Sequence, residues 1–401
     1  MRILHVVPSY IPAWRYGGPI KSVHGLCKGL AKSGHEVHVY TTNADGPKRL
    51  DVPLGVPVDM DGVKVWYFVS DWMRRLYWSP DMARALYKQV PRFDILHLHS
   101  IYLWPTTAAA RVARKHGIPY IVSPRGMLVR TLIRRKSRWL KTAWIELFER
   151  RNLAGAVAIH FTSRLEGEEA AKLDLRFNAT FIVPNGIDEI EIDDGSGKCD
   201  ISHGMSFQHQ RFLLFIGRIN WEKGLDRLIC AMPFIPECHL VIAGNDEEKY
   251  QPTLKALARR QGVHERISFL GPVYGPEKKA LLRHAMALVL PSYSENFGNV
   301  VLEGMAAGCP VVVTPEVGAA DLLQESGAGI VLDGSPATLG AGIAGLIGDP
   351  ERGREMGKRG RDAVVAKYTW EAIAQHMEAV YLKALSRRSH VRMFDREQEY
   401  L

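Results

Sequence analysis

Short apolar runs alternate along the first half of the chain with segments whose apolar residues recur at helical spacing. Several of the runs are continuous rather than alternating, as expected for parallel strands that are covered on both faces. The predicted strands cover residues 3–8, 36–41, 63–69, 94–100, 119–123, 156–162 and 180–183. The predicted helices between them cover residues 20–32, 80–89, 105–115, 130–151 and 164–173. This order predicts a doubly wound, Rossmann-like α/β domain over residues 1–188.

The same alternation begins again after a segment without periodicity. Residues 189–210 include Asp-Asp-Gly-Ser-Gly-Lys and are interpreted as a linker and hinge. The second set of predicted strands covers residues 211–216, 239–243, 266–270, 287–291, 310–314 and 329–332. We therefore predict a second Rossmann-like domain over 211–368, followed at 369–401 by a last helix, 370–386, and a charged, mobile tail.

Composition adds the class of protein to this outline. A chain of 401 residues with 46% apolar and 24% charged residues is typical of a globular protein with two cores. The five cysteines are scattered without a C-x2-C pair, which argues against zinc and disulfides and favours a reducing cytosol. Neither a signal peptide nor an apolar run of membrane-spanning length is present. The net charge of +9 indicates an anionic partner, and the absence of a nucleic-acid-binding module argues against nucleic acid.

The stretch 291–308 reads as a strand end, a polar loop and a helix that begins near Asn299. Glu295 then lies in the loop and Glu303 lies just past the first helical turn. A helix N-terminus favours an anion such as a diphosphate, and a carboxylate can accept hydrogen bonds from two sugar hydroxyls. The bland alternative is an ordinary strand–loop–helix with two solvated glutamates. The residues between the carboxylates, which would line such an anion and sugar site, are Asn296, Phe297, Gly298, Asn299 and Val300.

Two glycine-containing turns at strand-to-helix junctions are candidate phosphate sites. Arg218 and Lys223 lie in Gly-Arg-x4-Lys-Gly, which suits a diphosphate, although both residues can equally be surface charges. The sequence lacks the G-K-[ST] of a P-loop there. Gly17 and Gly18 precede the first helix and allow the backbone to approach a phosphate, or they only form the turn. Val273 and Tyr274 follow a later strand in a loop that resembles a nucleoside-facing loop, where either residue could contact the base, or that forms an ordinary turn.

Three residues at the mouth of the first predicted sheet are candidates for acid–base or anion chemistry. His97 and His99 point to one face of their strand; His97 is interpreted as a core histidine, and His99 as an acid–base group or hydrogen-bond donor at the strand end. No further ligand has a spacing that suggests a metal site. Arg125, in the next strand-end loop, stays protonated and therefore binds anions rather than acting as a base.

Residues 130–151 carry a net charge of +6 and a stripe of apolar residues that includes Trp139 and Trp144. A basic amphipathic helix with tryptophans suits the surface of an anionic membrane. The alternative is a domain helix whose apolar face packs on the sheet and whose basic face is solvated.

Taken together, these motifs resemble a known family. Glu295 and Glu303 resemble the Glu-x7-Glu motif, and Arg218 and Lys223 the diphosphate-binding pair, of retaining, nucleotide-sugar-dependent glycosyltransferases of family four. Further similarities are Gly17-Gly18, Gly34-His35-Glu36-Val37, Pro184-Asn185-Gly186-Ile187-Asp188 and Lys367-Tyr368-Thr369-Trp370, which together extend over nearly the whole chain.

This resemblance implies a GT-B fold, in which two Rossmann-like domains face each other across a cleft and the last helix crosses back to the first domain. It implies that Arg218 and Lys223 stabilise the leaving diphosphate, which Gly17 and Gly18 approach from across the cleft. Glu303 would hold the ribose, and Glu295 the transferred sugar, with same-face attack and no covalent intermediate. No metal or other cofactor is implied.

One position departs from the family pattern. Many members carry histidine where this chain has Arg125, and Ser-Pro-Arg-Gly-Met-Leu resembles a variant found in bacterial surface-polysaccharide assembly. We expect a cytoplasmic enzyme, peripheral on the inner face of the cytoplasmic membrane, that transfers a sugar to a carbohydrate or lipid-linked acceptor. The alternatives are a sugar-nucleotide epimerase of the same fold and a non-catalytic binding subunit of a synthase complex.

Overall fold

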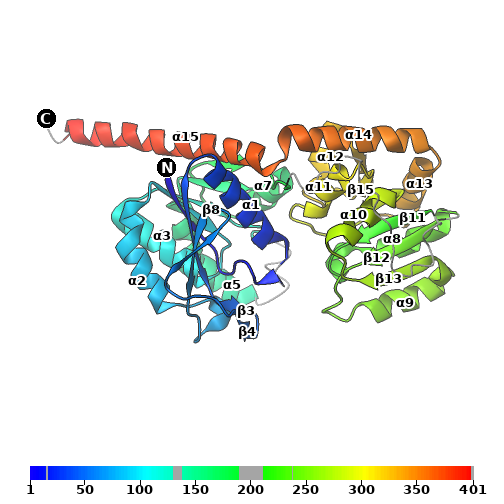
Figure 1. Ribbon diagram of the computed structural model, residues 1–401, viewed down its shortest axis with the longest axis horizontal. Helices are drawn as coiled ribbons and strands as arrows, with labels where there is room; N and C mark the ends of the chain where they lie inside the picture. Colours follow the sequence, from blue (N-terminus) through cyan, green and yellow to red (C-terminus); the bar gives the residue numbers. More distant parts are fainter. Residues whose placement is uncertain (15–16, 130–137, 189–210, 237, 399–401) are drawn as a thin grey trace. The chain divides into compact units, whose positions relative to one another are not determined.

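The chain folds into two compact units (Figure 1). The computed structural model describes residues 1–14, 17–129, 138–188, 211–236 and 238–398. Unit 1 comprises Met1–Gly186 and Trp370–Leu401, and unit 2 comprises Ile187–Thr369. The boundary falls at Gly186 because Ile187 already bonds to unit 2, donating its amide to the Tyr368 carbonyl at 2.9 Å. The predicted hinge, 189–210, lies outside the described residues.

Unit 1 is built on an eight-stranded sheet among the residues described, in the order β10-β9-β8-β7-β1-β2-β6-β5. Its strands are parallel except β5, which pairs antiparallel with β6. Strand β1 lies between β2 and β7, with His5 opposite His97. The strands, with the small β3–β4 pair, are β1 (Arg2–Val6), β2 (Glu36–Thr42), β3 (Ala44–Asp45), β4 (Lys48–Arg49), β5 (Pro57–Met60), β6 (Val63–Phe68), β7 (Ile95–His99), β8 (Tyr120–Ser123), β9 (Ala158–Phe161) and β10 (Thr180–Ile182).

Helices connect these strands, and the last helix of the chain returns to unit 1. The helices are α1 (Gly18–Lys32), α2 (Pro80–Gln89), α3 (Trp104–His116), α5 (Arg138–Trp144), the π-helical turn η4 (Ile145–Glu149), α6 (Arg150–Ala154), α7 (Arg164–Ala171) and α15 (Trp370–Gln398), with 3-10 turns η2 (Arg74–Leu76) and η3 (Val90–Arg92). Helix α15 packs on α1 beside Gly25 and Gly29, where an added Cβ would lie 2.1 and 2.6 Å from Trp370. This contact confirms the predicted crossover helix.

Unit 2 has a six-stranded parallel sheet among the described residues, in the order β13-β12-β11-β14-β15-β16. Its strands are β11 (Phe212–Ile216), β12 (His239–Ala243), β13 (Ile267–Gly271), β14 (Ala287–Leu290), β15 (Val311–Val313) and β16 (Gly329–Val331). Its helices are α8 (Leu225–Ala231), α9 (Gln251–Arg260), α10 (Gly275–His284), α11 (Asn299–Ala306), α12 (Ala320–Ser326), α13 (Pro336–Ile347) and α14 (Pro350–Lys367), with 3-10 turns η6 (Trp221–Lys223), η7 (Met232–Phe234) and η8 (His264–Arg266). Two apolar clusters cover the two faces of the sheet, which confirms the doubly wound architecture.

Two features of the fold differ from the sequence-based prediction. The short strands β3, β4 and β5 were not predicted, because the segment between β2 and β6 carries no period-two pattern. The helix α15 continues through the predicted tail to Gln398. Part of the predicted basic helix, residues 130–137, lies outside the described residues. Among those described, no helical segment combines the length and apolar composition that crossing a bilayer requires.

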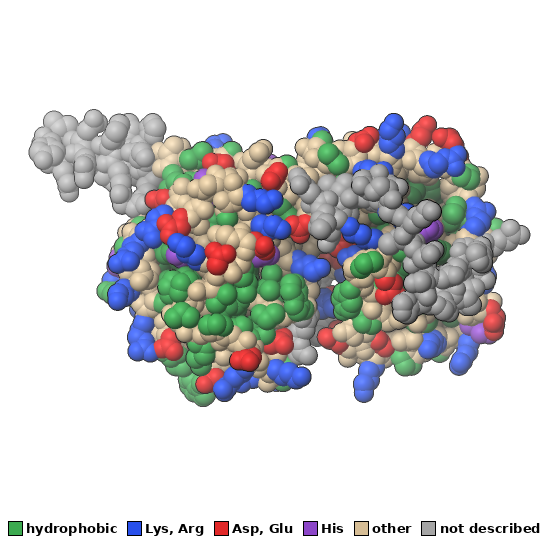
Figure 2. All heavy atoms as spheres, viewed as in Figure 1, with side chains coloured by type: hydrophobic (Ala, Val, Ile, Leu, Met, Phe, Trp, Pro, Cys, Tyr) green, Lys and Arg blue, Asp and Glu red, His purple; other side chains and the backbone are tan. Residues whose placement is uncertain are grey.

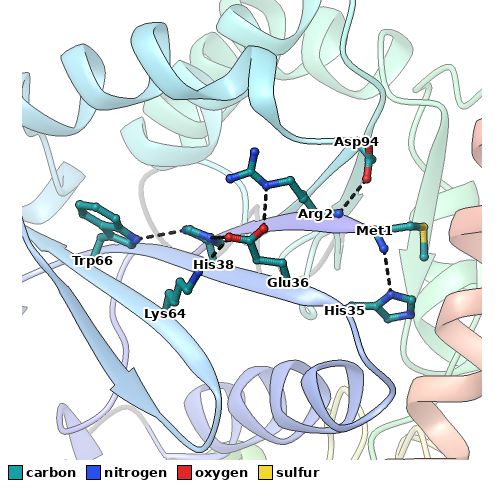
Figure 3. Close-up of polar contacts among 8 residues, drawn as sticks. All are labelled: Met1, Arg2, His35, Glu36, His38, Lys64, Trp66 and Asp94. Atoms are coloured by element: carbon teal, nitrogen blue, oxygen red, sulfur yellow. Dashed lines mark hydrogen bonds and ion pairs between the residues drawn. The ribbon is translucent and has the colours of Figure 1, made fainter.

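A network of charged side chains links strands β1, β2 and β6 at the amino-terminal edge of the unit 1 sheet (Figure 3). Glu36 accepts hydrogen bonds from Arg2 at 2.8 Å, Lys64 at 2.9 Å and His38 at 3.1 Å. These partners lower the pKa of Glu36 to about 2, and the hydrogen bond from Lys64 has the largest effect. Ligands of doubly wound sheets bind at the opposite, carboxyl edge. The Gly-His-Glu-Val segment therefore joins strands β1, β2 and β6 rather than forming part of a ligand site.

Candidate active site

The Gly-Arg-x4-Lys-Gly turn of unit 2 follows strand β11 and leads into α8. Arg218 is exposed on this turn, and Lys223 ends the 3-10 turn η6. Gly224 has a φ of 63°, and a Cβ on it would lie only 1.9 Å from the carbonyl oxygen of Pro291. Only glycine allows this approach. The turn is thereby pressed against the segment that carries Glu295.

Lys223 and Glu295, predicted as site residues from separate motifs, form an ion pair in the structure. Their side chains are only 14% and 19% exposed. The backbone around Glu295 is anchored, since its amide donates to Glu316 at 3.0 Å and its carbonyl accepts from Gly318 at 2.9 Å. The amide of Tyr293 donates to the Glu222 carbonyl at 2.8 Å. These bonds hold a cation and a carboxylate side by side.

Glu303 lies in α11, one turn past the helix start that the sequence predicts at Asn299. Its carboxylate pairs with the ammonium of Lys278 at 2.6 Å, and both side chains are less than a fifth exposed. Lys278 comes from α10 and was not predicted as a site residue. Sequence reasoning missed it because the two residues meet only when α10 packs on α11. Each glutamate of the Glu-x7-Glu motif therefore has a lysine partner.

The other predicted donor residues surround this start of α11. Gly298 has a φ of 89° and caps the helix, Phe297 is buried, and Asn296, Asn299 and Val300 are half-buried. The Val273 side chain belongs to the core of unit 2, whereas the adjacent Tyr274 is exposed. The structure thus leaves the backbone of 273 and the side chain of Tyr274 as the groups available to a base.

An aromatic platform in the same loops was not predicted. The guanidinium of Arg227 lies 3.7 Å from the ring centroid of Tyr293, close enough for a cation–π contact. The Tyr293 hydroxyl donates to Asp226 at 2.8 Å. This cluster stiffens the loop that carries Glu295.

Gly17 and Gly18 lie in unit 1, at the start of α1. Gly17 has a φ of 65° and a ψ of −130°, a conformation that side-chain-bearing residues avoid. Gly18 opens the helix and is followed by Pro19, as is common at a first turn. The local geometry explains why glycine is needed at 17, and the contact with a diphosphate remains a prediction.

His99 is buried rather than exposed at the strand end, and it lies beneath Arg125. Arg125 donates to His99 Nδ1 at 3.4 and 3.3 Å and to the Asn185 side chain at 3.0 Å. Burial lowers the pKa of Arg125 to about 10, which still leaves it charged at neutral pH. Burial also holds the pKa of His99 well below its usual value, so this ring stays neutral. The neutral ring of His99 can therefore accept from the guanidinium of Arg125 and hold it in position.

His99 belongs to a buried group of four histidines, completed by His5, His97 and His160. His160 Nε2 donates to the Val183 carbonyl at 2.8 Å, so its Nδ1 accepts from His97 Nε2 at 3.2 Å. Since Arg125 occupies His99 Nδ1, His99 Nε2 donates to His5 Nδ1 at 2.9 Å. Burial, and then the charge of Arg125, lower the pKa of both His5 and His160 to about 3.

Three of these rings, those of His5, His97 and His99, bring nitrogens within 4.8 Å of one another, a spacing that a metal ion could use. No spacing along the chain indicates this group, because His5 comes from another strand. Of the ring nitrogens of the four histidines, only His5 Nε2 has no hydrogen-bond partner among the described residues, and that nitrogen carries the proton. A cation would also be repelled by Arg125. The ring nitrogens of this group therefore do not suit a metal ion.

The described part of the basic helix exposes apolar residues rather than burying all of them. Trp139 is 83% exposed and Leu147 is 70% exposed, whereas Trp144 packs at the edge of the unit 1 core. Figure 2 shows hydrophobic side chains gathered on the near face of unit 1. The π-helical turn directs Glu149 inward, where it accepts from the Tyr102 amide at 2.8 Å and the Trp144 indole at 3.0 Å. Burial raises the pKa of Glu149.

Each half of the chain matches a known protein family. The family described as Glycosyl transferases group 1 matches residues 204–363, and the family described as Glycosyl transferase 4-like domain matches residues 17–186. An uncharacterised glycosyltransferase of Methanocaldococcus jannaschii is 28% identical over 96% of this chain and 99% of its own length.

Two further proteins are similar over almost their whole length. The glycogen synthase of Mycobacterium tuberculosis is 26% identical, over 96% of this chain and 95% of its own. The structure of Anabaena HepE in complex with UDP superposes with a TM-score of 0.74 and 18% identity, over 96% of this chain and all of that one. At this identity the structural likeness establishes the fold.

Proposed function

Since the chain belongs to the group 1 glycosyltransferases and has the GT-B fold, we propose that it transfers a sugar from a nucleoside diphosphate sugar with retention of configuration. The acceptor that we propose is a carbohydrate or lipid-linked precursor. The observation that carries the proposal is the Lys223–Glu295 ion pair. It joins a phosphate-binding cation to a sugar-binding carboxylate in unit 2.

The chemistry of the donor follows from these groups. As the bond from the anomeric carbon to the diphosphate breaks, negative charge grows on the leaving phosphate. Arg218, Lys223 and the amide groups at the start of α11 would stabilise that charge, and such preorganised electrostatics usually give the largest catalytic contribution. These fixed cations can serve where other enzymes use a metal ion, so we propose metal-independent transfer.

The two glutamates divide the recognition of the donor. Glu303 would accept from the ribose hydroxyls, and Lys278 would hold its carboxylate in place. Glu295, held by Lys223, would accept from hydroxyls of the transferred sugar. An ion-paired carboxylate suits this task better than nucleophilic attack, which supports same-face transfer without a covalent intermediate. On the acceptor side, His99 would position Arg125 to bind an anionic group of the acceptor or the leaving phosphate.

A thermal-shift panel of UDP, GDP, ADP, dTDP and NAD, with and without EDTA, tests the donor. UDP is the expected ligand, because Anabaena HepE, which has the same fold, binds it. Binding at 100 times Kd adds about 2.7 kcal/mol to the stability of the folded state, which corresponds to a shift of about 5 °C or more. We expect the shift to survive EDTA.

Each other result has a definite meaning. Stabilisation by NAD alone would contradict the proposed reaction. Loss of the UDP shift in EDTA would contradict metal independence. Binding of UDP without turnover of UDP-sugars in the presence of candidate acceptors would favour the non-catalytic binding subunit, and release of an epimerised sugar nucleotide would favour the epimerase.

We further propose that α5 and η4 attach the enzyme to an anionic membrane at its cytoplasmic face. The exposed Trp139 and Leu147 would enter the interface while the lysines and arginines of 130–151 contact the headgroups. The described cysteines are free, in keeping with a reducing compartment.

Vesicle sedimentation tests this attachment. Wild-type protein is expected to bind phosphatidylglycerol vesicles at low salt and to be released by added salt, because screening weakens the attraction. The double variant Trp139→Ala/Leu147→Asp is expected to lose most of the binding. Phe234→Ala, an exposed aromatic of unit 2, serves as the matched control and should bind as wild type does. Salt-independent or absent binding would refute the attachment.

A further inference from the structure

Three tryptophans line the loops that follow strands β6 and β7 of unit 1. Trp72 and Trp78 lie between β6 and α2, and Trp104 opens α3. The ring centroids of Trp72 and Trp78 are 5.5 Å apart at 81°, and those of Trp78 and Trp104 are 6.4 Å apart at 63°. The indoles thus contact one another edge to face in a row, which we name the tryptophan ladder.

The ladder runs from the core to solvent. Trp104 packs on the apolar cluster of unit 1, Trp78 is half-buried, and Trp72 is 67% exposed. The neighbouring Met73 is exposed as well. Contiguous exposed apolar surface marks a site of interaction, and indoles are favoured where one side of a ligand is apolar and the other is polar.

The ladder lies at the edge of the sheet where ligands of this fold bind. Both of its loops start at carboxyl ends of parallel strands, and the β7 loop begins directly after His99. Non-glycine residues with positive φ concentrate in these loops and in the next one, after β8. They are Met73 (50°), Tyr77 (57°), Ser100 (73°), Tyr102 (61°) and Arg125 (55°). Such strained backbone persists where the surrounding structure imposes it, commonly at functional sites.

Charged groups of both signs surround the ladder. Asp71, next to Trp72, pairs with Arg49 at 2.9 Å, and Asp81, in the first turn of α2, pairs with Arg84. Arg74 and Arg75 lie between Trp72 and Trp78, and Arg74 donates to the Pro47 carbonyl at 2.7 Å. The groups around the ladder therefore offer sugar hydroxyls both donors and acceptors. A pyranose ring stacks its C–H face on an indole and points its hydroxyls outward, where such charged groups can reach them.

We propose that the tryptophan ladder binds a saccharide chain of the acceptor, with successive sugar units along Trp72, Trp78 and Trp104 towards the Arg125–His99 pair. This inference rests on the proposed transferase function, and it narrows the acceptor to a saccharide of more than one unit. A monosaccharide or a small polyol would leave the exposed end of the ladder unused.

The test uses an array of linear saccharides of two to six units, probed with the labelled full-length protein in the presence of UDP. Wild type is expected to bind saccharides of three or more units better than disaccharides. Trp72→Ala should weaken the binding of the longer ones about tenfold, and Trp72→Phe should restore most of it, because a stacking ring returns. Phe234→Ala, an exposed aromatic of unit 2, serves as the matched control and should bind the array as wild type does.

A parallel thermal shift with UDP separates this inference from the proposed function, since it reports folding and donor binding without the ladder. A UDP shift with no saccharide binding, or with equal binding by Trp72→Ala, overturns the ladder proposal and leaves the transferase intact. Loss of vesicle binding by Trp72→Ala, with the array unchanged, would assign the ladder to a membrane and overturn the proposal as well.

Discussion

Lys223→Met is expected to lower kcat by about a hundredfold or more, since removing one preorganised charge from a site of developing negative charge typically costs that much. The ammonium of Lys223 would stabilise the diphosphate as it leaves, and it also holds Glu295. The substitution keeps an unbranched side chain of similar length and removes the charged ammonium group. Steady-state kinetics with the donor identified by thermal shift measures the effect.

Two further variants give this result its meaning. Glu295→Ala should lose activity to a similar degree, and the double variant should lose little more than either single one, because the two residues act as a unit. Lys358→Met, an exposed lysine on α14 of the same unit, should be unaffected. An intact rate in Lys223→Met or Glu295→Ala would remove these residues from the active site.

Acid should destabilise unit 1 steeply between pH 6.5 and pH 3. His5 and His160 have a folded pKa of about 3, whereas an unfolded histidine titrates near its ordinary value of about 6.5. In that window these histidines bind protons in the unfolded chain but not in the folded unit. The free energy of unfolding therefore falls, for each histidine, by up to about 1.4 kcal/mol for every pH unit that the pH is lowered. At pH 5 the two together cost about 4 kcal/mol relative to pH 7.5.

Hydrogen exchange of β1 and β7 measures this loss in unit 1 alone. The buried Glu149 and Glu166 act in the opposite direction, because burial raises their pKa values and their protonation favours the folded state in acid. Comparison with His5→Phe removes this complication, because both proteins contain these glutamates. In the variant the free energy of unfolding should fall less steeply as the pH is lowered, because unfolding takes up about one proton fewer. His264→Phe, on the other unit, should leave the slope unchanged. A pH-independent difference between wild type and His5→Phe would contradict the assignment.

Much of the candidate site is local in the sequence, which is why it could be predicted. Glu295, Glu303, Arg218 and Lys223 lie in strand–loop–helix segments whose spacing already indicates which end of the helix faces a ligand. The start of α11 at Asn299 is as predicted from the helical spacing of the apolar residues that follow it. The crossover helix was implied by the family resemblance of the Lys367-Tyr368-Thr369-Trp370 junction.

Other features arise only when distant segments meet. Lys278 reaches Glu303 through the packing of α10 on α11, His5 joins His97 and His99 because β1 pairs with β7, and the tryptophan ladder unites two loops. The burial of His99 beneath Arg125 likewise depends on neighbouring strands, and no spacing along the chain encodes it.

The sequence by itself determined the α/β alternation, which depends on periodicity over a few residues, and its motifs indicated the family; the residues that it nominated for the diphosphate and the donor sugar stay predictions. The tertiary structure alone decided the partners and protonation of those residues: which lysine holds each glutamate, which histidines stay neutral, and which aromatic rings remain exposed. The physical reason is that burial and charge depend on everything that packs around a group, and most of those neighbours are remote in the chain.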